Sequence, residues 1–177
     1  MKKRTGFLIS ILLLVGVSQF ALANTLPEVV AKEHAALSMC GEGDLRFLGF
    51  KVYNARLWTP VKPHSASEVF AIHLVYDMSF KGREIAERSV AEMRKVGYKD
   101  EQKLKRWGEE MLRIFPDIKK GDALIGVSIP GKGAKFYSRE KLIAIAEDAE
   151  FARAFFDIWL SEKTSEPKLR EKLLGTQ

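Results

Sequence analysis

The chain has 177 residues and carries 29 Lys and Arg against 23 Asp and Glu, a formal net charge of +6. Hydrophobic residues make up 46% of it and charged residues 29%, which excludes a disordered chain, a collagen-like repeat and a polytopic membrane protein. The single cysteine, Cys40, excludes an internal disulfide framework. Because a basic chain invites a nucleic-acid interpretation, the first question is where the positive charges lie.

The N-terminal segment has the three parts of a secretory signal peptide. Lys2, Lys3 and Arg4 precede an apolar run over residues 7–17, and Ala21-Leu22-Ala23 forms an A-x-A cleavage site. The apolar run is shorter than the about 20 residues that a membrane span needs, although an uncleaved anchor is the alternative. We therefore predict that residues 1–23 are a signal peptide and that residues 24–177 form one periplasmic or secreted domain.

Cleavage after Ala23 changes the charge balance. Residues 24–177 keep 26 basic and 23 acidic side chains, a net charge of +3 over 154 residues. The basic residues between positions 103 and 120 alternate with acidic ones, which is typical of a solvated helix face. We predict no nucleic-acid partner. In an oxidising compartment, Cys40 is either a buried small side chain or a thiol that forms an intermolecular disulfide or reacts.

The first half of the predicted domain combines strands with two helices. A short helix is expected within residues 24–38, after which Gly41 and Gly43 are expected to break the chain. Aromatic and aliphatic residues predict one or two strands between Leu45 and Trp58, and a buried strand over Val69–Tyr76. Apolar residues at helical spacing then predict two helices, one from Lys81-Gly82 to Gly97 and one over residues 100–114.

The second half is predicted to be a strand meander followed by helices. Strands are expected over residues 123–129, 134–137 and 142–146. Asp148 can cap the next helix, and Glu166-Pro167 opens a short terminal helix. Because tight connections favour antiparallel pairing, the predicted class is α+β, with helices packed on one face of an antiparallel sheet.

Two patterns that suggest a cofactor or a metal do not fit their context. Gly126 to Lys132 matches G-x-x-x-x-G-K, but Gly133 stands where a phosphate-binding loop needs Ser or Thr, and the segment has the pattern of a hairpin. The three histidines, His34, His64 and His73, are far apart and follow no ligand spacing. We therefore predict no cofactor and no metal site, and a structural role for His73.

Several segments in chain order carry a family pattern. They are Gly49-Phe-Lys-Val-Tyr-Asn-Ala-Arg-Leu-Trp58, Phe115-Pro-Asp, Gly121-Asp122, Pro130-Gly-Lys-Gly133 with Phe136-Tyr137, and the stretch from Phe151 to Gly175. Together they resemble the bacterial chalcone isomerase-like proteins, over residues 39–175. The resemblance implies an open-faced β-sandwich, a large antiparallel sheet with helices against one side.

The resemblance also implies where a site would lie. Plant enzymes of the wider superfamily close a flavanone ring with an Arg and a Thr on early strands and a Tyr and an Asn on the following helix, while related proteins without this activity bind fatty acids in the equivalent cleft. The corresponding positions here are Arg46, Tyr53, Ile85 and Glu92. Since Ile85 has no hydroxyl group to hold an oxyanion or its water, we do not expect isomerase activity.

Arg46 and Tyr53 could both donate to a carboxylate while apolar walls hold an acyl tail. Their spacing of seven residues would place them on opposite faces of one regular strand unless a bulge intervenes. Arg56 is expected to face away from Tyr53 and to form a surface ion pair.

We therefore hypothesise an exported, non-catalytic protein that binds a fatty acid or another small amphipathic ligand between sheet and helices. An isomerase or lyase acting on an unknown enone-type substrate is one alternative. An envelope interaction module without a ligand is the other. The sequence points to no particular protein partner, and no membrane span is expected after signal cleavage.

Overall fold

The computed structural model describes residues 25–176, so the predicted signal peptide and its cleavage site after Ala23 lie outside the described residues. The strands are β1 (Ser38–Phe47), β2 (Phe50–Thr59), β3 (Phe70–Tyr76), β4 (Ala123–Ile129), β5 (Gly133–Tyr137) and β6 (Leu142–Ala146). The helices are α1 (Glu28–Ala31), α2 (Gly82–Val96), α3 (Glu101–Ile114), α4 (Ala149–Leu160) and α5 (Pro167–Leu174). No helix in this part of the chain is both long and apolar enough to cross a membrane.

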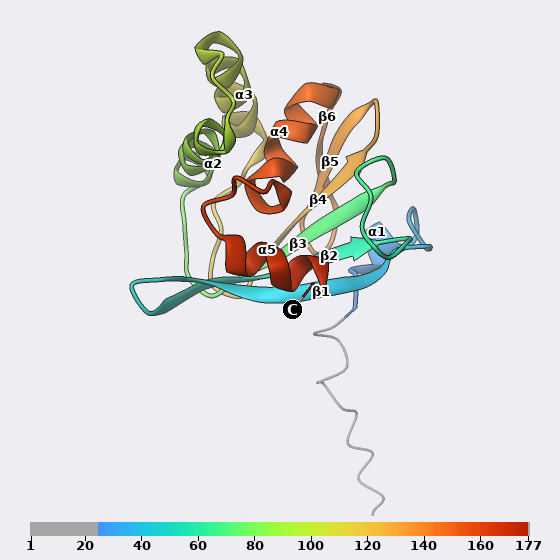
Figure 1. The fold of residues 1–177 in the computed structure, drawn as a ribbon. Coiled ribbons are helices and arrows are strands. Elements are labelled where there is room, and N and C mark those ends of the chain that lie inside the picture. Colours follow the sequence, from blue (N-terminus) through green and yellow to red (C-terminus); the bar gives the residue numbers. More distant parts are fainter. Residues whose placement is uncertain (1–24, 177) are drawn as a thin grey trace, which may run out of the picture.

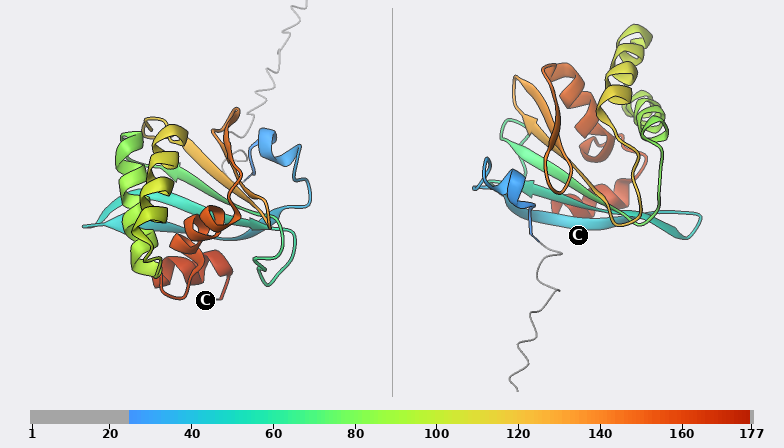
Figure 2. Two further views of the ribbon diagram at one scale, coloured as in Figure 1. Left: turned by 90° about the horizontal axis from the view of Figure 1, so that it is seen from above. Right: turned by 180° about the vertical axis from the view of Figure 1, so that it is seen from behind.

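The strands form one sheet in chain order, each antiparallel to the next. Short connections after β1, β4 and β5 account for this meander, because tight turns join antiparallel neighbours. Helices α2 to α5 all lie on one side of the sheet (Figures 1 and 2). The predicted α+β class and open-faced sandwich are therefore confirmed.

The face toward the helices carries the main core. Ala55, Leu57, Ile72, Leu74 and Leu124 point from β2, β3 and β4 into this layer and are buried. Helix α4 packs directly on the sheet because β4 carries glycine beneath it; a Cβ at Gly126 would lie 3.1 Å from the ring of Phe156. Helix α2 instead has α3 and α4 as its main neighbours, which leaves space between α2 and the sheet.

Aspartate side chains cap the starts of α3 and α4, and the cap predicted for Asp148 is confirmed. Asp100 accepts hydrogen bonds from the backbone N–H groups of Gln102 and Lys103, and Asp148 accepts them from Glu150 and Phe151. The Asp148 carboxylate also accepts a 3.1 Å hydrogen bond from the indole N–H of Trp107, a contact that joins α3 to the start of α4.

The prediction that Gly41 and Gly43 break the chain was wrong. Strand β1 runs through both residues, because α5 lies directly on it and leaves no room for side chains. A Cβ at Gly41 would overlap the carbonyl oxygen of Lys172, and one at Gly43 would lie 2.8 Å from a methyl group of Leu169. Cys40 beside them is a half-buried free thiol, 3.8 Å from the carbonyl oxygen of Leu174.

The opposite face of the sheet is covered in part by the N-terminal lead-in. Val30 of α1 packs there against a second cluster that includes Trp58, Ala71, Ile125 and Val127. As predicted, Arg56 faces away from Tyr53 and pairs with Glu42 at 3.0 Å, although Arg56 is buried rather than at the surface.

His73 lies on this second face and is 3% exposed, with neither ring nitrogen hydrogen-bonded within the described residues. Burial, with the positive charges of Arg56 and Arg139, lowers the pKa of His73 to about 3. The imidazole is thus neutral in the fold, while the unfolded chain takes up a proton below about pH 6.5. Stability is therefore lost as the pH falls from about 6.5 toward 3.

We expect the free energy of unfolding to decrease by about 2 kcal/mol between pH 7 and pH 5 through His73 alone. Urea denaturation at several pH values measures this. The His73→Leu variant should show a shallower pH dependence, since it has no proton to take up at this position. An unchanged slope in the variant would mean that other groups set the acid sensitivity.

Candidate ligand-binding site

The space beneath α2 is a cleft of about 470 Å³, within the range of about 300–1,000 Å³ that is typical of small-molecule sites. Its walls come from both strands of the β1–β2 hairpin, from β3 and β4, and from α2 and α4. The lining is mainly apolar: Leu45, Phe47, Leu48, Phe50, Val52, Leu74, Met78, Phe80, Ile85, Leu124, Phe155, Ile158 and Trp159. The polar lining residues are Arg46, Tyr53, Tyr76, Glu84, Arg88, Ser89, Glu92, Ser165 and Glu166.

The roof of the cleft is held at the start of α2. A bridge between Phe80 and Ile118 fixes the segment that precedes the helix. Asp117 then accepts hydrogen bonds from the Gly82 backbone N–H at 3.0 Å and from the Lys81 ammonium at 2.8 Å. The first turn of α2 is thereby tied to the loop after α3, and this places Ile85 above the sheet.

Two tyrosines stand side by side on the floor. Tyr53 on β2 pairs with Tyr76 on β3, and their rings meet edge to face with centroids 5.7 Å apart. The Tyr53 hydroxyl accepts a 3.0 Å hydrogen bond from the Trp159 indole, while the Tyr76 hydroxyl has no hydrogen-bond partner within residues 25–176. Burial raises the pKa of both phenols well above the usual value. Both hydroxyls therefore stay protonated at neutral pH and can donate to a ligand.

Glu92 is the buried carboxylate of the cleft, with its side chain 7% exposed. Burial opposes its ionisation, but a 2.6 Å hydrogen bond from Ser165 and ion pairs with Lys95 at 3.0 Å and Arg88 at 2.7 Å lower the pKa of Glu92 below its usual value. The carboxylate is thus ionised and already paired. The hydrogen bond that it accepts from Ser165 holds α2 against the segment between α4 and α5. With these partners, the Glu92 carboxylate has little capacity left to bind a ligand.

Arg46 and Tyr53 lie on two strands, one of the two arrangements predicted for residues 45–58, so the condition of a single regular strand is not met. A turn at Leu48-Gly49 places Arg46 on β1 and Tyr53 on β2. The pairing shifts between Leu45, which faces Tyr53, and Arg46, which faces Lys51, so that an irregularity does bring both residues to the cleft. Arg46 lies at its edge, where it donates to the Gly49 carbonyl at 3.3 Å and pairs with Asp44 at 3.7 Å.

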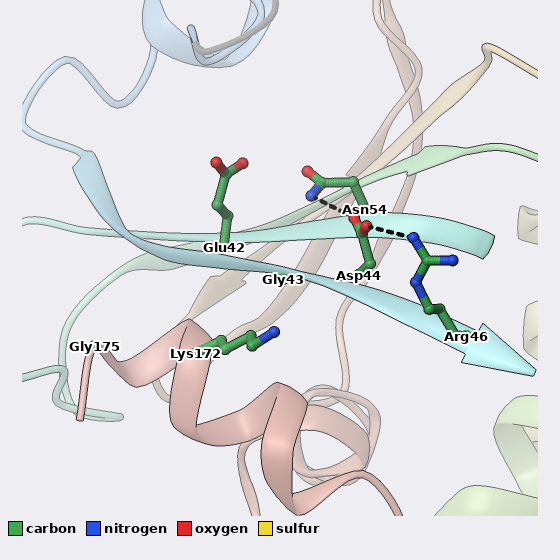
Figure 3. Close-up of a pocket in the computed structure, with 7 residues that line it drawn as sticks. All are labelled: Glu42, Gly43, Asp44, Arg46, Asn54, Lys172 and Gly175. Carbon is green, nitrogen blue, oxygen red and sulfur yellow. Dashed lines mark hydrogen bonds and ion pairs between the residues drawn. The ribbon is translucent and has the colours of Figure 1, made fainter. Parts of the chain in front are cut away.

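Arg46 also borders a second hollow, on the outer side of the hairpin near α5 (Figure 3). This hollow has a volume of about 680 Å³, and its lining is polar: Glu42, Gly43, Asp44, Arg46, Asn54, Lys172 and Gly175. Its carboxylates are already engaged, Glu42 by Arg56 at 3.0 Å and Asp44 by Arg46, Lys51 and Asn54. It is open to solvent and offers no apolar wall, so we regard the cleft under α2 as the candidate site.

The structure places all four residues named from the sequence in the lining of one cleft: Arg46 at the edge, Tyr53 on the floor, Ile85 and Glu92 in the roof. Sequence reasoning missed Tyr76, Arg88 and Trp159. Arg88 follows Ile85 by three residues and precedes Glu92 by four, a spacing that puts the three on one helix face and could have identified it. Nothing in the sequence could have paired Trp159 with Tyr53, 106 positions away.

Comparison with known proteins agrees with this architecture. A family model described as chalcone isomerase-like matches residues 22–175. The chain belongs to the chalcone isomerase-like family. An uncharacterized protein of Haemophilus influenzae is 26% identical over 136 residues, which cover 76% of this chain and 66% of that relative, so the chain spans slightly less than two thirds of its length.

A crystal structure of a fatty-acid binding protein from Arabidopsis thaliana has a similar fold. It aligns with a TM-score of 0.60 over 80% of this chain and 88% of that chain, at 14% sequence identity. At this level of identity the likeness supports the chalcone isomerase-like fold, and the ligand has to be argued from the side chains of the cleft.

Proposed function

We propose that this chalcone isomerase-like protein binds a fatty acid or another small amphipathic molecule in the cleft under α2, and that it does so without catalysing a reaction. The observation that carries the proposal is the cleft itself: an apolar space of about 470 Å³ with a few polar groups along its walls. Such a composition suits a ligand with an acyl chain and one polar end.

The polar end would be held by donors that the fold leaves unused. The Tyr76 hydroxyl has no partner within the described residues, and the Tyr53 hydroxyl accepts from Trp159 but has its own proton to give. Arg46 adds a positive charge at the edge of the cleft. Phenol and guanidinium donors together favour a carboxylate over a neutral group.

Catalysis has less support from the same residues. Ile85 stands where the plant enzymes are implied to have a tyrosine, and an aliphatic sec-butyl side chain can neither donate a proton nor hold an oxyanion. Glu92, at the asparagine position, is already paired with Arg88 and Lys95 and hydrogen-bonded to Ser165. The cleft therefore offers binding groups more readily than a proton-transfer pair.

We also propose that the protein acts outside the cytoplasm, on the basis of the charged start, the apolar run and the A-x-A site in residues 1–23. Mass spectrometry of the protein recovered from cells checks this. An N-terminus at Asn24 is expected, and a chain that still begins at Met1 would contradict it.

Titration with palmitate, followed by calorimetry, tests the binding proposal through Tyr53. The Tyr53→Phe variant should bind palmitate about tenfold more weakly, because a hydrogen bond to a charged group is lost. Its affinity for the corresponding fatty alcohol should change less. The matched control is Tyr137→Phe, which removes a buried hydroxyl from the opposite face of the sheet and should leave the affinity unchanged.

Other outcomes would favour the two alternatives. A cleft that stays empty with every acyl chain tested would favour an interaction module without a ligand. Steady turnover of chalcones or related enones, lost on changing Tyr53, would show that the protein is an isomerase or lyase.

A further inference from the structure

The tip of the β1–β2 hairpin exposes an unusual group of apolar side chains. Phe47, Leu48 and Phe50 are 62%, 81% and 70% exposed, the highest values among the large hydrophobic residues of the described chain. They surround the turn, which projects beyond the rest of the sheet (Figures 1 and 2). Three large apolar side chains at one protruding turn form an anchor-like surface.

The turn also has a residue that its backbone does not favour. Leu48 and Gly49 both have positive φ, 50° and 85°, the conformation of a two-residue hairpin turn for which Asn-Gly is the usual sequence. A bulky residue with positive φ is strained, and Leu48 gains no burial in return. Backbone strain of this kind concentrates at functional sites, which suggests that the leucine is kept for a contact outside the fold.

The exposed tip is continuous with the mouth of the cleft. Phe47, Leu48 and Phe50 line the cleft together with Met78, which is 41% exposed, and Phe80. An apolar path therefore runs from the outer surface of the hairpin into the space under α2. A ligand that enters along this path would not have to pass through bulk water.

Basic residues lie around the same end of the sheet. Arg46 is exposed at the tip, and Lys51 is shared between Asp44 and Asp77 at 3.2 Å each. Lys119 and Lys120 follow in the loop before β4, close to Met78, since the Lys120 backbone N–H donates to Ser79 at 3.2 Å.

Acidic residues are also present at this end, among them Glu84, Asp117 and Asp122. Asp117 is paired with Lys81, and Asp122 accepts from the Lys119 backbone N–H. The side chains of Lys119 and Lys120 have no ion pair within residues 25–176. The Glu84 and Asp122 carboxylates also have no ion pair there, but each accepts a hydrogen bond from a backbone N–H. Free lysine ammonium groups therefore lie in the loop beside Met78 and Ser79. Apolar side chains flanked by free lysines suit a surface of anionic lipid headgroups.

We propose that the hairpin tip inserts into the surface of an anionic lipid bilayer and that the cleft exchanges its ligand with that bilayer. The exchange rests on the proposed function, whereas the insertion does not. A protein partner is a weaker candidate, because a standard protein interface takes about 20–30 residues from each side, many more than this turn supplies.

A fluorescent tryptophan at the tip tests the insertion. The native tryptophans, Trp58, Trp107 and Trp159, are all buried. Because Trp159 lines the cleft, the signal of the wild-type protein with the same vesicles is subtracted as the background. In the processed protein, Leu48→Trp should show a blue-shifted emission and quenching by brominated acyl chains in vesicles of phosphatidylglycerol. The matched control is Ile145→Trp, at an exposed position on β6 at the other edge of the sheet, which should show neither effect.

Two further variants separate insertion from a general effect of hydrophobicity. Leu48→Asn should raise the midpoint of thermal unfolding, because asparagine tolerates positive φ, and should weaken vesicle binding. Phe47→Ser with Phe50→Ser should weaken vesicle sedimentation by about tenfold or more, while Leu142→Ser with Ile145→Ser should not.

The outcomes distinguish this proposal from the binding function. Failure of the wild-type protein to sediment with anionic vesicles, or equal quenching at positions 48 and 145, would overturn insertion even if palmitate binds in solution. A dimer in ultracentrifugation that is lost in Leu48→Asn would also overturn it, in favour of a second copy of the chain. Palmitate titration without vesicles reports on the cleft alone.

Discussion

Replacing Ile85 with tryptophan is expected to reduce the affinity for palmitate by at least about a hundredfold, because the indole would occupy space that the acyl chain needs. Ile85 is half-buried, lies in the roof, and lines the open cleft at the margin of the main core. The acyl chain would lose apolar contact equal to burying about two side chains. The free energy lost with that contact is enough for a reduction in affinity of this size. Titration of the variant with palmitate measures it.

The control for Ile85→Trp makes the same substitution elsewhere. Ile143 on β6 is also half-buried but does not line the cleft, so Ile143→Trp should bind palmitate as the wild type does. Thermal unfolding shows whether each variant is folded. Wild-type affinity in a folded Ile85→Trp protein would place the ligand somewhere other than under α2.

Gly82→Ala is expected to destabilise the protein by about 3 kcal/mol. A Cβ at this position would overlap the carbonyl oxygen of Phe115, which belongs to the backbone and cannot simply rotate away. The first turn of α2 would have to move, and the hydrogen bond from Gly82 to Asp117 would be disturbed. Urea denaturation should show a lower midpoint, and palmitate affinity should decrease as well because α2 forms the roof.

The neighbouring exposed residue provides the comparison. Arg83→Ala removes a side chain that makes only a 3.8 Å pair with Glu87, and exposed pairs of this kind contribute little. Its free energy of unfolding should stay within about 0.5 kcal/mol of the wild-type value. Equal stability of Gly82→Ala and Arg83→Ala would mean that the contact with Phe115 does not constrain α2.

The parts of the fold with local signals could be predicted from the sequence. Apolar residues at helical spacing identified α2 and α3, and Asp100 and Asp148 marked helix starts that the structure confirms. The glycines of β1 were misinterpreted because their cause is not local. Gly41 and Gly43 are required by α5, which comes more than 120 residues later in the chain and leaves no space for a Cβ.

The β1–β2 hairpin is a second feature that local sequence patterns predict only in part. A two-residue hairpin turn usually has the sequence Asn-Gly, and here only Gly49 fits this pattern because Leu48 is not a usual turn residue. The turn between β1 and β2 was therefore hard to recognise in the sequence. The sequence thus left open whether Arg46 and Tyr53 lie on one strand or on two. The turn and the shifted pairing after Leu45 could be found only once the register of the two strands was known.

The site itself was predictable in its residues but not in its shape. The positions of Arg46, Tyr53, Ile85 and Glu92 followed from the family resemblance, and all four line one cleft. Helical spacing shows which face of α2 points inward, but it does not show whether that face meets a packed core or an open space. The distance between α2 and the sheet depends on Asp117, Phe115 and Gly82, which no periodic pattern connects.

Native mass spectrometry of the wild-type protein with palmitic acid tests the central claim most directly. The account predicts a complex of one fatty acid per chain, strongly reduced in Ile85→Trp and retained in Ile143→Trp. No complex with any acyl chain, or an equally populated complex in all three proteins, would contradict it.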